Sequence, residues 1–246
     1  MYNTIQGIAM LIYIIILTLY GKKYGFSKRK SFLLGIIAVV VDYTAILLLT
    51  WIENGFTNFG AQNAVRVFVF NPLFLFIVSK LLKVDYRKYC DFNAFPAMMW
   101  YGLGHFACLT TNCCAGYAYY EGTFLYKVAH MLTGTNMLPQ QILESLGALC
   151  IAAILYEIGR AYNFKTNGYM YYIMLILYGS QRFLFEFLRN NEKIIVFGDM
   201  ASSDGVIGLS SLSLWALAMF IEGVVLLTIT VFLDKKREKR GQVNTI

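Results

Sequence analysis

Charged residues are scarce in this chain: only 14% of its 246 residues are Asp, Glu, Lys or Arg, whereas 58% are hydrophobic. So little polar surface does not suffice to cover a soluble domain, which excludes the ordinary water-soluble enzymes and carriers. Negatively charged residues are scarcer than positively charged ones, with 14 Asp and Glu against 21 Lys and Arg. A lipid bilayer is therefore the expected solvent of the chain.

Linker sequence is also lacking. The chain has only 3 Pro, and it shows no long polar linker, no low-complexity segment and no visible internal repeat. No Lys or Arg precedes the first apolar run and no small-residue cleavage site follows it, which argues against a signal peptide. We therefore expect residues 1–246 to form a single transmembrane domain.

Long apolar runs are abundant. Crossing roughly 30 Å of hydrocarbon takes about 20 helical residues, each rising about 1.5 Å. Seven runs reach or approach that length, which predicts an all-α polytopic membrane protein with about seven transmembrane helices. They cover residues 5–20, 32–52, 65–82, 92–110, 138–159, 169–188 and 209–233.

Basic residues indicate the orientation of these spans. Most of the 21 Lys and Arg fall in alternate loops and in the C-terminal tail, at 22–30, 80–88, 160–165 and 235–240. Short cytoplasmic loops are enriched in Lys and Arg, so we expect the N-terminus outside and the C-terminus in the cytoplasm. The net charge of +7 then follows from topology and contact with anionic membrane lipids, and no nucleic-acid partner is indicated.

One substantial outer loop, residues 115–137, separates the fourth and fifth spans. It is rich in aromatic side chains, which settle in the headgroup layer of a membrane. We therefore expect an interfacial arm rather than a further span. The aromatic residues are Tyr117, Tyr119, Tyr120, Phe124 and Tyr126.

Polar and ionisable side chains gather at the predicted outer ends of three spans. A charge inside the bilayer costs about 2.5 to 3.5 kcal/mol on insertion scales, so each one needs a partner or a function. Spacings of three, four and seven residues place the members of a cluster on one helical face. The clusters are His105, Cys108 and Asn112; Gln140, Gln141 and Glu144; and Arg182, Glu186 and Arg189.

With this orientation the clusters lie near the outer leaflet, within reach of a lipid headgroup and an extracytoplasmic partner. Arginine suits a phosphate, because its planar guanidinium donates two parallel hydrogen bonds and stays charged. We therefore predict a functional site around Arg182 and Arg189. The structural alternative is that Arg182 pairs with Glu186 or Glu144 only to hold the bundle together.

The segment GHFACLTTNCCAG, residues 104–116, holds three of the five cysteines. Four uses are open for Cys108, Cys113 and Cys114. They are tight packing between helices, a disulfide from Cys108 to either other cysteine or between the adjacent pair, a reactive thiol, and a metal site with His105. Adjacent cysteines are awkward ligands for one tetrahedral ion. We therefore expect no metal and no other cofactor.

His105 is a candidate base for an acceptor thiol. Imidazole can be neutral near pH 7 and can therefore take up a proton without a shift of its pKa. The structural alternative is a buried histidine bonded to Asn112, and His130 in the outer loop is a second candidate base.

Four ordered motifs resemble a known family, the prolipoprotein diacylglyceryl transferases. DFNAFPAMMWYGLGHFAC resembles its D-x-x-A-x-P lead-in to a G-R-x-G-N/C segment, and LPQQILES its H-P-x-Q-L-Y-E-x stretch. QRFLFEFLR resembles its R-x-x-x-E-F-x-R stretch, and GLSSLSLWALAMFIEG the G-L-S opening of its last span. The matches keep the family order over residues 91–223, about half of the chain.

The resemblance implies an enzyme of the bacterial cytoplasmic membrane. Such an enzyme moves the diacylglyceryl group of phosphatidylglycerol onto the cysteine thiol of a lipoprotein precursor and releases glycerol phosphate. The resemblance also implies that Arg182 binds the phosphate and that Glu186 and Arg189 complete its motif. The other matched positions are Asp91, Pro96, Gly104, Gln141 and Glu144.

The chain departs from the family pattern at several positions. His105 replaces the arginine of the G-R-x-G segment, Ala107 replaces its second glycine, and Leu138 replaces the histidine before Pro139. No H-G-G segment occurs in or before the third span, where FGAQNAVRVF stands. ACLTTNCCAG is closest to the G-C-F-x-x-G-C-C-x-G form of some divergent relatives, so the acceptor is less well defined than the lipid donor.

We therefore predict a phosphatidylglycerol-dependent diacylglyceryl transferase acting on a prolipoprotein or related thiol acceptor. One alternative is a proton-coupled transporter, which would use Asp42 and Glu222 in mid-membrane, paired with each other or with Asn71, or protonated. The other is a catalytically inactive lipid-binding relative. The predicted catalytic residues are His105, Arg182, Glu144 and Glu186, and the predicted substrate contacts are Arg189, Gln140, Gln141 and Asn112.

Overall fold

The computed structural model describes residues 1–53, 55–57, 64–111, 113–114, 116, 118, 121–189, 195–196 and 208–239. Apart from one pair of two-residue strands, its elements are helical. In chain order they are α1 (Tyr2–Tyr20), η1 (Gly21–Tyr24), α2 (Lys28–Glu53), α3 (Ala64–Leu81), α4 (Tyr86–His105), η2 (Phe106–Thr110), α5 (Phe124–Thr133), α6 (Gln140–Ala161), α7 (Tyr169–Glu186), β1 (Ile195–Val196), β2 (Gly208–Leu209) and α8 (Ser211–Lys239).

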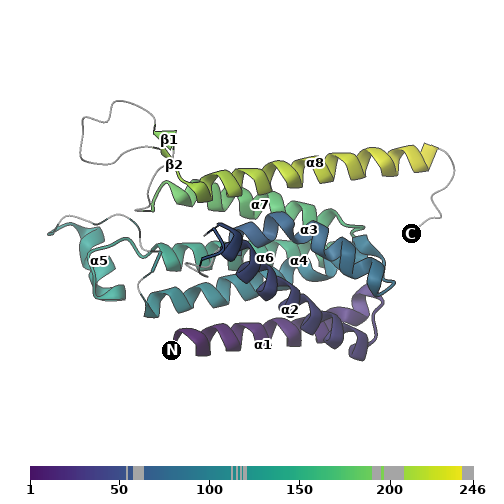
Figure 1. Cartoon of the computed structure of the whole chain (residues 1–246), viewed down its shortest axis with the longest axis horizontal. Helices are drawn as coiled ribbons and strands as arrows, with labels where there is room; N and C mark the ends of the chain where they lie inside the picture. The colour runs from purple at the N-terminus through teal and green to yellow at the C-terminus, as the bar shows by residue number, and fades with distance from the viewer. Residues whose placement is uncertain are drawn as a thin grey trace.

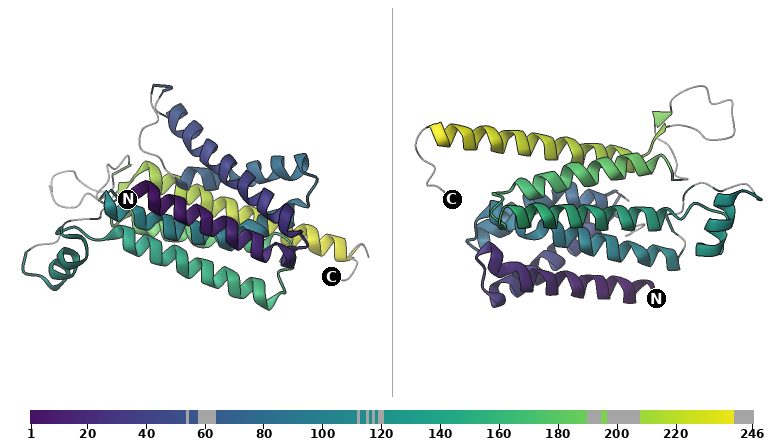
Figure 2. Two further views of the ribbon diagram at one scale, coloured as in Figure 1. Left: turned by 90° about the horizontal axis from the view of Figure 1, so that it is seen from below. Right: turned by 180° about the vertical axis from the view of Figure 1, so that it is seen from behind.

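The long helices form one elongated bundle (Figure 1). Helix α4 contacts α1, α3, α6 and α7, and α8 packs along α7 and α3. The N-terminus lies at the same end of the bundle as the end of α4, the start of α6 and the end of α7 (Figures 1 and 2). We call this the N-terminal end; α8 finishes at the opposite end.

The predicted all-α class is confirmed, and a long helix forms at each of the seven predicted spans. Within the part of the chain that the structure describes, four stretches are long and apolar enough to cross a membrane: Tyr2–Tyr24, Lys28–Ile52, Gln140–Ala161 and Ser211–Glu238. At two of the other predicted spans, α4 and α7 carry amide, carboxylate and guanidinium groups that are buried in the interior. The number of crossings and the outside N-terminus stay predictions.

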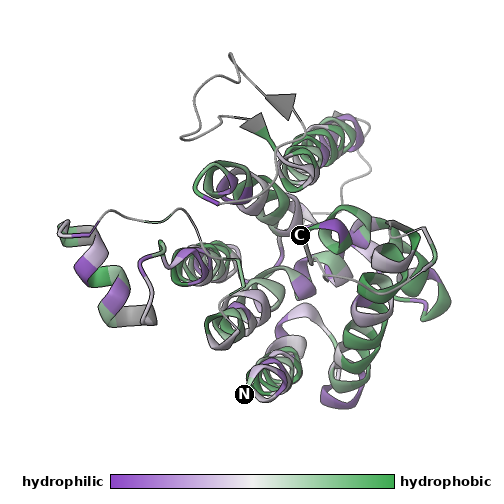
Figure 3. Ribbon diagram, turned by 60° about the vertical axis from the view of Figure 1, so that its left-hand side comes forward, coloured by the Kyte–Doolittle hydropathy of each residue, from purple (hydrophilic) through white to green (hydrophobic). Residues whose placement is uncertain are grey.

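Large apolar side chains cover the outside of the bundle. Leu11 and Leu19 on α1 are 62% and 64% exposed, and Phe232 on α8 is 65% exposed. Figure 3 shows that the helices of the bundle consist largely of hydrophobic residues. A surface of this kind is stable against lipid and not against water.

Helix α4 is buried almost throughout its first half, and its polar residues there bind other elements. Asp91 is 1% exposed and accepts hydrogen bonds from the Thr166 hydroxyl (2.6 Å) and from the backbone N–H groups of Gly168 (2.6 Å) and Tyr171 (3.1 Å). Gly168 has φ +93°, a conformation that favours glycine. Asp91, matched by resemblance alone, therefore fixes the start of α7 against α4.

Helix α5 lies beyond the N-terminal end of the bundle, inside the predicted arm of residues 115–137 (Figures 1 and 2). The Thr123 hydroxyl accepts a hydrogen bond from the Tyr126 N–H (3.1 Å), and Gly134 with φ +70° ends the helix. That this helix rests on the membrane surface stays a prediction, as does the single-domain organisation of the chain.

The two mid-span acids are not joined to each other. In the described part of the chain, no ion pair or hydrogen bond links Asp42 with Glu222. Glu222 Oε2 and Asn71 Oδ1 are buried atoms without hydrogen-bond partners there. The pairing of Asp42 and Glu222 with each other or with Asn71, which the transporter hypothesis predicts, is therefore not formed.

Candidate functional site

The three polar clusters predicted from the sequence converge at the N-terminal end of the bundle. Helices α6 and α7 contact each other, and both contact α4. Glu144, Arg182, Glu186 and Arg189 are all at most 5% exposed. Burial of charged groups costs several kcal/mol per ion unless each is paired, so the contacts among them decide what this cluster can do.

Glu144 lies at the centre of the site. Its Oε1 accepts hydrogen bonds from Arg182 (2.5 Å) and from the Gln140 side-chain amide (3.2 Å). Its Oε2 lies 2.9 Å from Nε2 of His105 and 3.4 Å from the Tyr101 hydroxyl, which donates to it. One carboxylate thereby joins residues of α4, α6 and α7.

Arg182 bridges two carboxylates. One terminal nitrogen binds Glu144, and the other lies 3.1 Å from Oε2 of Glu186. Arg189 also approaches Glu186, at 3.6 Å, and the Ser210 hydroxyl donates a hydrogen bond of 2.7 Å to Glu186 Oε1. Arg182 is therefore paired with Glu144 and with Glu186 at once, as the structural alternative predicts. Among the described residues, the Nε of Arg182 is its only buried nitrogen without a hydrogen-bond partner.

Helix α7 ends at Glu186, so Arg189 lies past the predicted helical stripe. A β-bridge between Arg189 and Gly116 holds this segment. A Cβ atom on Gly116 would come within 2.7 Å of the Leu188 carbonyl oxygen, so the close approach of the two chains requires a glycine. The final Gly of the CCAG segment thereby helps to position Arg189.

Several polar atoms around Glu144 have no hydrogen-bond partner in the described part of the chain. Gln140 and Gln141 use their amide nitrogens on the backbone oxygens of Phe185 (2.7 Å) and Cys113 (2.5 Å). Their oxygens Oε1 are buried and unpartnered, as is Oγ of Ser145. Unsatisfied buried groups are uncommon in stable proteins, so these atoms are suited to a polar ligand or to bound water.

His105 ends α4 and stacks on Tyr101 with ring centroids 5.2 Å apart. Nε2 lies 2.9 Å from Glu144 Oε2 and is a buried atom without an aligned hydrogen bond among the described residues. Nδ1 lies 3.9 Å from Sγ of Cys108. The ring therefore connects the carboxylate cluster with the cysteine segment.

The five cysteines are all free thiols, so none of the three possible disulfides among Cys108, Cys113 and Cys114 is formed. Cys108 is buried in η2, whereas Cys113 is exposed, and its sulfur lies 3.2 Å from the Thr111 hydroxyl that donates to it. Sγ of Cys108, Sγ of Cys114 and a ring nitrogen of His105 all lie within 4.8 Å of one another. Asn112, a predicted substrate contact and partner of His105, lies outside the described residues.

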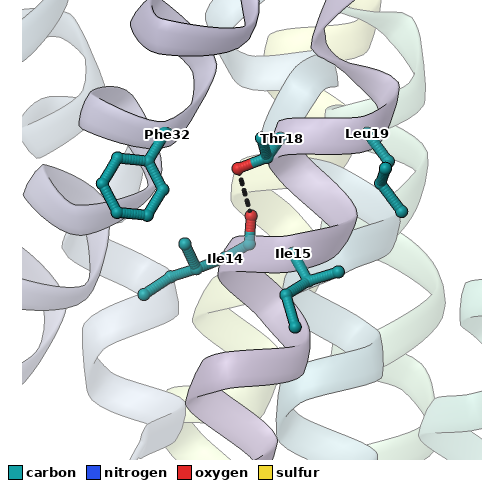
Figure 4. Close-up of a pocket in the computed structure, with 5 residues that line it drawn as sticks. All are labelled: Ile14, Ile15, Thr18, Leu19 and Phe32. Atoms are coloured by element: carbon teal, nitrogen blue, oxygen red, sulfur yellow. Dashed lines mark hydrogen bonds between the residues drawn. The ribbon is translucent and has the colours of Figure 1, made fainter.

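An apolar hollow lies on a different part of the bundle, between α1 and α2 (Figure 4). Its lining contains one polar side chain, Thr18, whose hydroxyl donates to the backbone oxygen of Ile14 (2.7 Å) and is thus satisfied. Hydrocarbon suits such a surface, but no catalytic group lines it. The lining residues are Ile14, Ile15, Thr18, Leu19 and Phe32.

The fold and the site together define a polytopic helical membrane protein with a buried network of arginine, glutamate and histidine at one end of its bundle. The family model described as prolipoprotein diacylglyceryl transferase matches residues 2–229, nearly the whole chain. The chain belongs to this family, which makes it a membrane transferase of lipoprotein biosynthesis. No curated protein matches the chain.

Proposed function

We propose that this protein transfers the diacylglyceryl group of phosphatidylglycerol to the cysteine thiol of a lipoprotein precursor or a related acceptor. The observation that carries the proposal is the continuous contact from His105 through Glu144, Arg182 and Glu186 to Arg189, in a chain of this family. It combines a group that can take up a proton with two cations that can face a phosphate.

In the proposed reaction His105 acts as the base. Its Nδ1 is directed at a thiol in the structure, that of Cys108 at 3.9 Å, so the same ring edge suits an acceptor thiol. The acceptor gives its proton to Nδ1, and its sulfur attacks the glyceryl carbon that carries the phosphate ester. A carbon–sulfur bond forms, the carbon–oxygen bond breaks, and glycerol phosphate leaves with the electron pair.

Glu144 supports this base. A carboxylate 2.9 Å from Nε2 stabilises the imidazolium that forms when Nδ1 takes up the proton. Arg182 holds the carboxylate in place through its bond to Oε1. Glu144 therefore acts in our proposal through His105 and not on the lipid.

Arg189 and Arg182 bind the phosphate of the donor lipid and of the leaving group. Arg189 lies at the end of the network, 3.6 Å from Glu186 and past the last residue of α7. Arg182 contributes its unpartnered Nε. The unpartnered oxygens of Gln140 and Gln141 suit the hydroxyl groups of the glycerol headgroup, and we retain Asn112 as a contact on sequence grounds.

The proposed location is the bacterial cytoplasmic membrane, with the site near the outer leaflet. The charge asymmetry of the loops supports this orientation, because the N-terminal end of the bundle holds the site and the basic loops lie at the other end. Phosphatidylglycerol and an exported precursor would then reach the site from the same side.

The donor lipid can be tested directly. The full chain is reconstituted into vesicles of phosphatidylglycerol or of phosphatidylethanolamine with a cysteine-bearing lipoprotein-signal peptide. The released headgroup is measured, as glycerol phosphate from the first lipid and as ethanolamine phosphate from the second. Release is expected with phosphatidylglycerol alone. Arg189→Ala should lower it about 10- to 100-fold, the value of one charge-assisted hydrogen bond, whereas Arg160→Ala, an exposed arginine of α6, should not change it. Equal release from both lipids, or none from either, would reject the proposal.

A further inference from the structure

The His105, Cys108 and Cys114 side chains form a cluster with the ligand chemistry of a transition-metal site. Their nitrogen and sulfur atoms all lie within 4.8 Å of one another, and the His105 Nδ1 to Cys108 Sγ distance is 3.9 Å. Imidazole nitrogen and thiolate sulfur are the two commonest ligands of zinc in proteins. The cluster thus offers nitrogen and sulfur ligands, whereas the neighbouring network of Glu144, Arg182, Glu186 and Arg189 consists of carboxylate and guanidinium groups.

The separations are close to those that a bound ion requires. Zinc lies about 2.3 Å from sulfur and about 2.0 to 2.1 Å from nitrogen. In a tetrahedral site these bonds place a nitrogen and a sulfur about 3.6 Å apart, and two sulfurs about 3.8 Å apart. Contraction by a few tenths of an ångström, or by about 1 Å at most, brings the three atoms to these separations.

The objection raised by adjacent cysteines does not apply here, because only one of the adjacent pair joins the cluster. Cys113 is exposed, and its sulfur contacts the Thr111 hydroxyl (3.2 Å) and the Cys108 carbonyl oxygen (3.9 Å). Cys114 has φ +64°, a conformation that a residue other than glycine adopts at a cost. Cys114 therefore joins the cluster from this conformation, whereas Cys113 stays outside it.

A carboxylate lies behind the histidine, as it does in many metal sites. Histidine ligands commonly present their second ring nitrogen to a carboxylate, which fixes the tautomer and strengthens the ligand. Here Glu144 Oε2 lies 2.9 Å from Nε2, which leaves Nδ1 on the side of the two thiols. Glu144 is in turn held by Arg182, so the outer part of such a site is already assembled.

We propose that His105, Cys108 and Cys114 bind one zinc ion or a similar thiophilic divalent metal ion, and that the fourth position of this ion receives the thiolate of the acceptor. The three protein ligands are the number found in catalytic zinc sites, which keep one position open. The metal site stands on its own geometry, whereas the role of its fourth position rests on the proposed function.

The metal changes the chemistry proposed for His105. A thiol that binds zinc loses its proton, here to solvent, so His105 acts as a ligand when the ion is present and as a base when it is absent. The zinc-bound thiolate then attacks the glyceryl carbon, and the carbon–oxygen bond to glycerol phosphate breaks as before. This arrangement gives a reason for a histidine at position 105, where the resemblance leads one to expect an arginine.

Metal binding is measured on the purified full chain in detergent, kept reduced with a phosphine, stripped with a chelator and reloaded with zinc or cobalt. We expect one zinc ion per chain by mass spectrometry of the metal. With cobalt we expect the charge-transfer absorption of thiolate ligands. Unaltered protein that retains no metal, or cobalt bound without thiolate absorption, would overturn the proposal even if no variant could be purified.

Variants identify the ligands. Cys108→Ser and Cys114→Ser should each lower the affinity for zinc by at least about tenfold and weaken the cobalt–thiolate absorption. Cys113→Ser is the matched control, because it alters the neighbouring thiol and should leave both readouts unchanged. Full metal retention in the Cys108→Ser/Cys114→Ser double variant would refute the assignment.

The two proposals fail in different ways. If zinc binds to these residues but neither the metal-free nor the zinc-loaded protein releases glycerol phosphate, the proposed function fails and the metal site stands. If both forms transfer the lipid at the same rate, the metal site stands and the role of its fourth position is excluded. A rate that rises at least about tenfold on zinc loading, and does not rise in Cys114→Ser, supports both.

Discussion

Glu144 shows how the chemistry of this site depends on single contacts between helices. It is 1% exposed, and its two oxygens face a guanidinium, an amide, an imidazole and a phenol. A carboxylate so enclosed stays ionised only through these partners. Loss of any charged partner therefore affects both the stability of the bundle and the state of His105.

Replacing Arg182 by alanine should both inactivate and destabilise the protein. The substitution leaves Glu144 and Glu186 buried without their shared cation, which costs about 3 to 5 kcal/mol of unfolding free energy. Unfolding in detergent, followed by circular dichroism or a thermal shift, measures the loss. The control is Arg160→Ala, whose partner Glu157 and own side chain are 55% and 67% exposed; it should cost less than about 1 kcal/mol. Equal stability of the two variants would contradict the bridging role of Arg182.

Asp91 should be a structural residue. Asp91→Ala removes the acceptor for three hydrogen bonds and leaves the buried N–H groups of Gly168 and Tyr171 unpaired. We expect a loss of about 3 kcal/mol or more, because each unsatisfied buried group costs about 1 to 3 kcal/mol. Asp85→Ala removes the exposed N-cap of the same helix and should cost about 1 kcal/mol. A similar loss in both variants, measured by chemical unfolding, would argue against this function of Asp91.

Much of the site could be predicted from spacing within one segment, and little of it across segments. The intervals of four residues correctly joined Gln140 to Glu144 and Arg182 to Glu186. No such interval relates His105 to Glu144, because that contact depends on how α4 packs against α6. Ser210 was not selected from the sequence, although it is the serine of the quoted G-L-S motif.

At the scale of elements, the ends of helices differ from the prediction. The fourth predicted span covers residues 92–110, and α-helical spacing is assumed as far as Asn112. In the structure α4 ends at His105 and continues as the 3₁₀ helix η2. In a 3₁₀ helix the residues i and i+3 eclipse each other, so His105 and Cys108 still meet. Hydrophobic length predicts where a helix lies, but it does not determine the form of its last turn.

The contact between α7 and α8 depends on a glycine. A Cβ atom on Gly179 would lie 2.7 Å from the backbone nitrogen of Phe220 and 3.0 Å from the carbonyl oxygen of Ala216. Because both neighbours are backbone atoms, the helices would have to separate, and α7 carries Arg182 and Glu186. Small residues permit this kind of close approach in membrane bundles.

Gly179→Ala should therefore destabilise the bundle by about 1 to 3 kcal/mol, as overpacking does, and should lower transfer activity through α7. Gly7→Ala on α1 is the matched control, since nothing lies within 4 Å of its added Cβ; it should be neutral or stabilising by up to about 1 kcal/mol. Unfolding midpoints of the two variants in the same detergent provide the comparison. A stable, active Gly179→Ala variant would exclude the close packing of α7 on α8.

At the scale of the whole molecule, composition was enough to predict a helical membrane protein, because apolar length directly sets the ability to cross a bilayer. The same reasoning cannot distinguish a polar span from a buried helix. Helices α4 and α7 bury carboxylate, guanidinium and amide groups against protein, and these groups lower the hydrophobicity of the two sequences. The number of crossings must therefore be measured.

Thiol labelling tests the orientation. A membrane-impermeant maleimide should label the exposed Cys113 in intact spheroplasts, because the site end of the bundle faces outward in our account. In a Cys113→Ser background, Lys236→Cys at the exposed end of α8 should be labelled only after permeabilisation. Labelling of Lys236→Cys before permeabilisation, with Cys113 protected, would reverse the orientation and place the site in the cytoplasm.

The central claim, that the network around Glu144 catalyses diacylglyceryl transfer, is tested most directly by one mass measurement. The full chain is reconstituted with phosphatidylglycerol and a cysteine-bearing lipoprotein-signal peptide, and the peptide is weighed by mass spectrometry. We predict a diacylglyceryl mass increase that persists in Glu157→Gln, on the exposed face of α6, and falls at least about 100-fold in Glu144→Gln, the usual contribution of acid–base catalysis. An unmodified peptide with the unaltered protein, or full transfer by Glu144→Gln, would contradict the account.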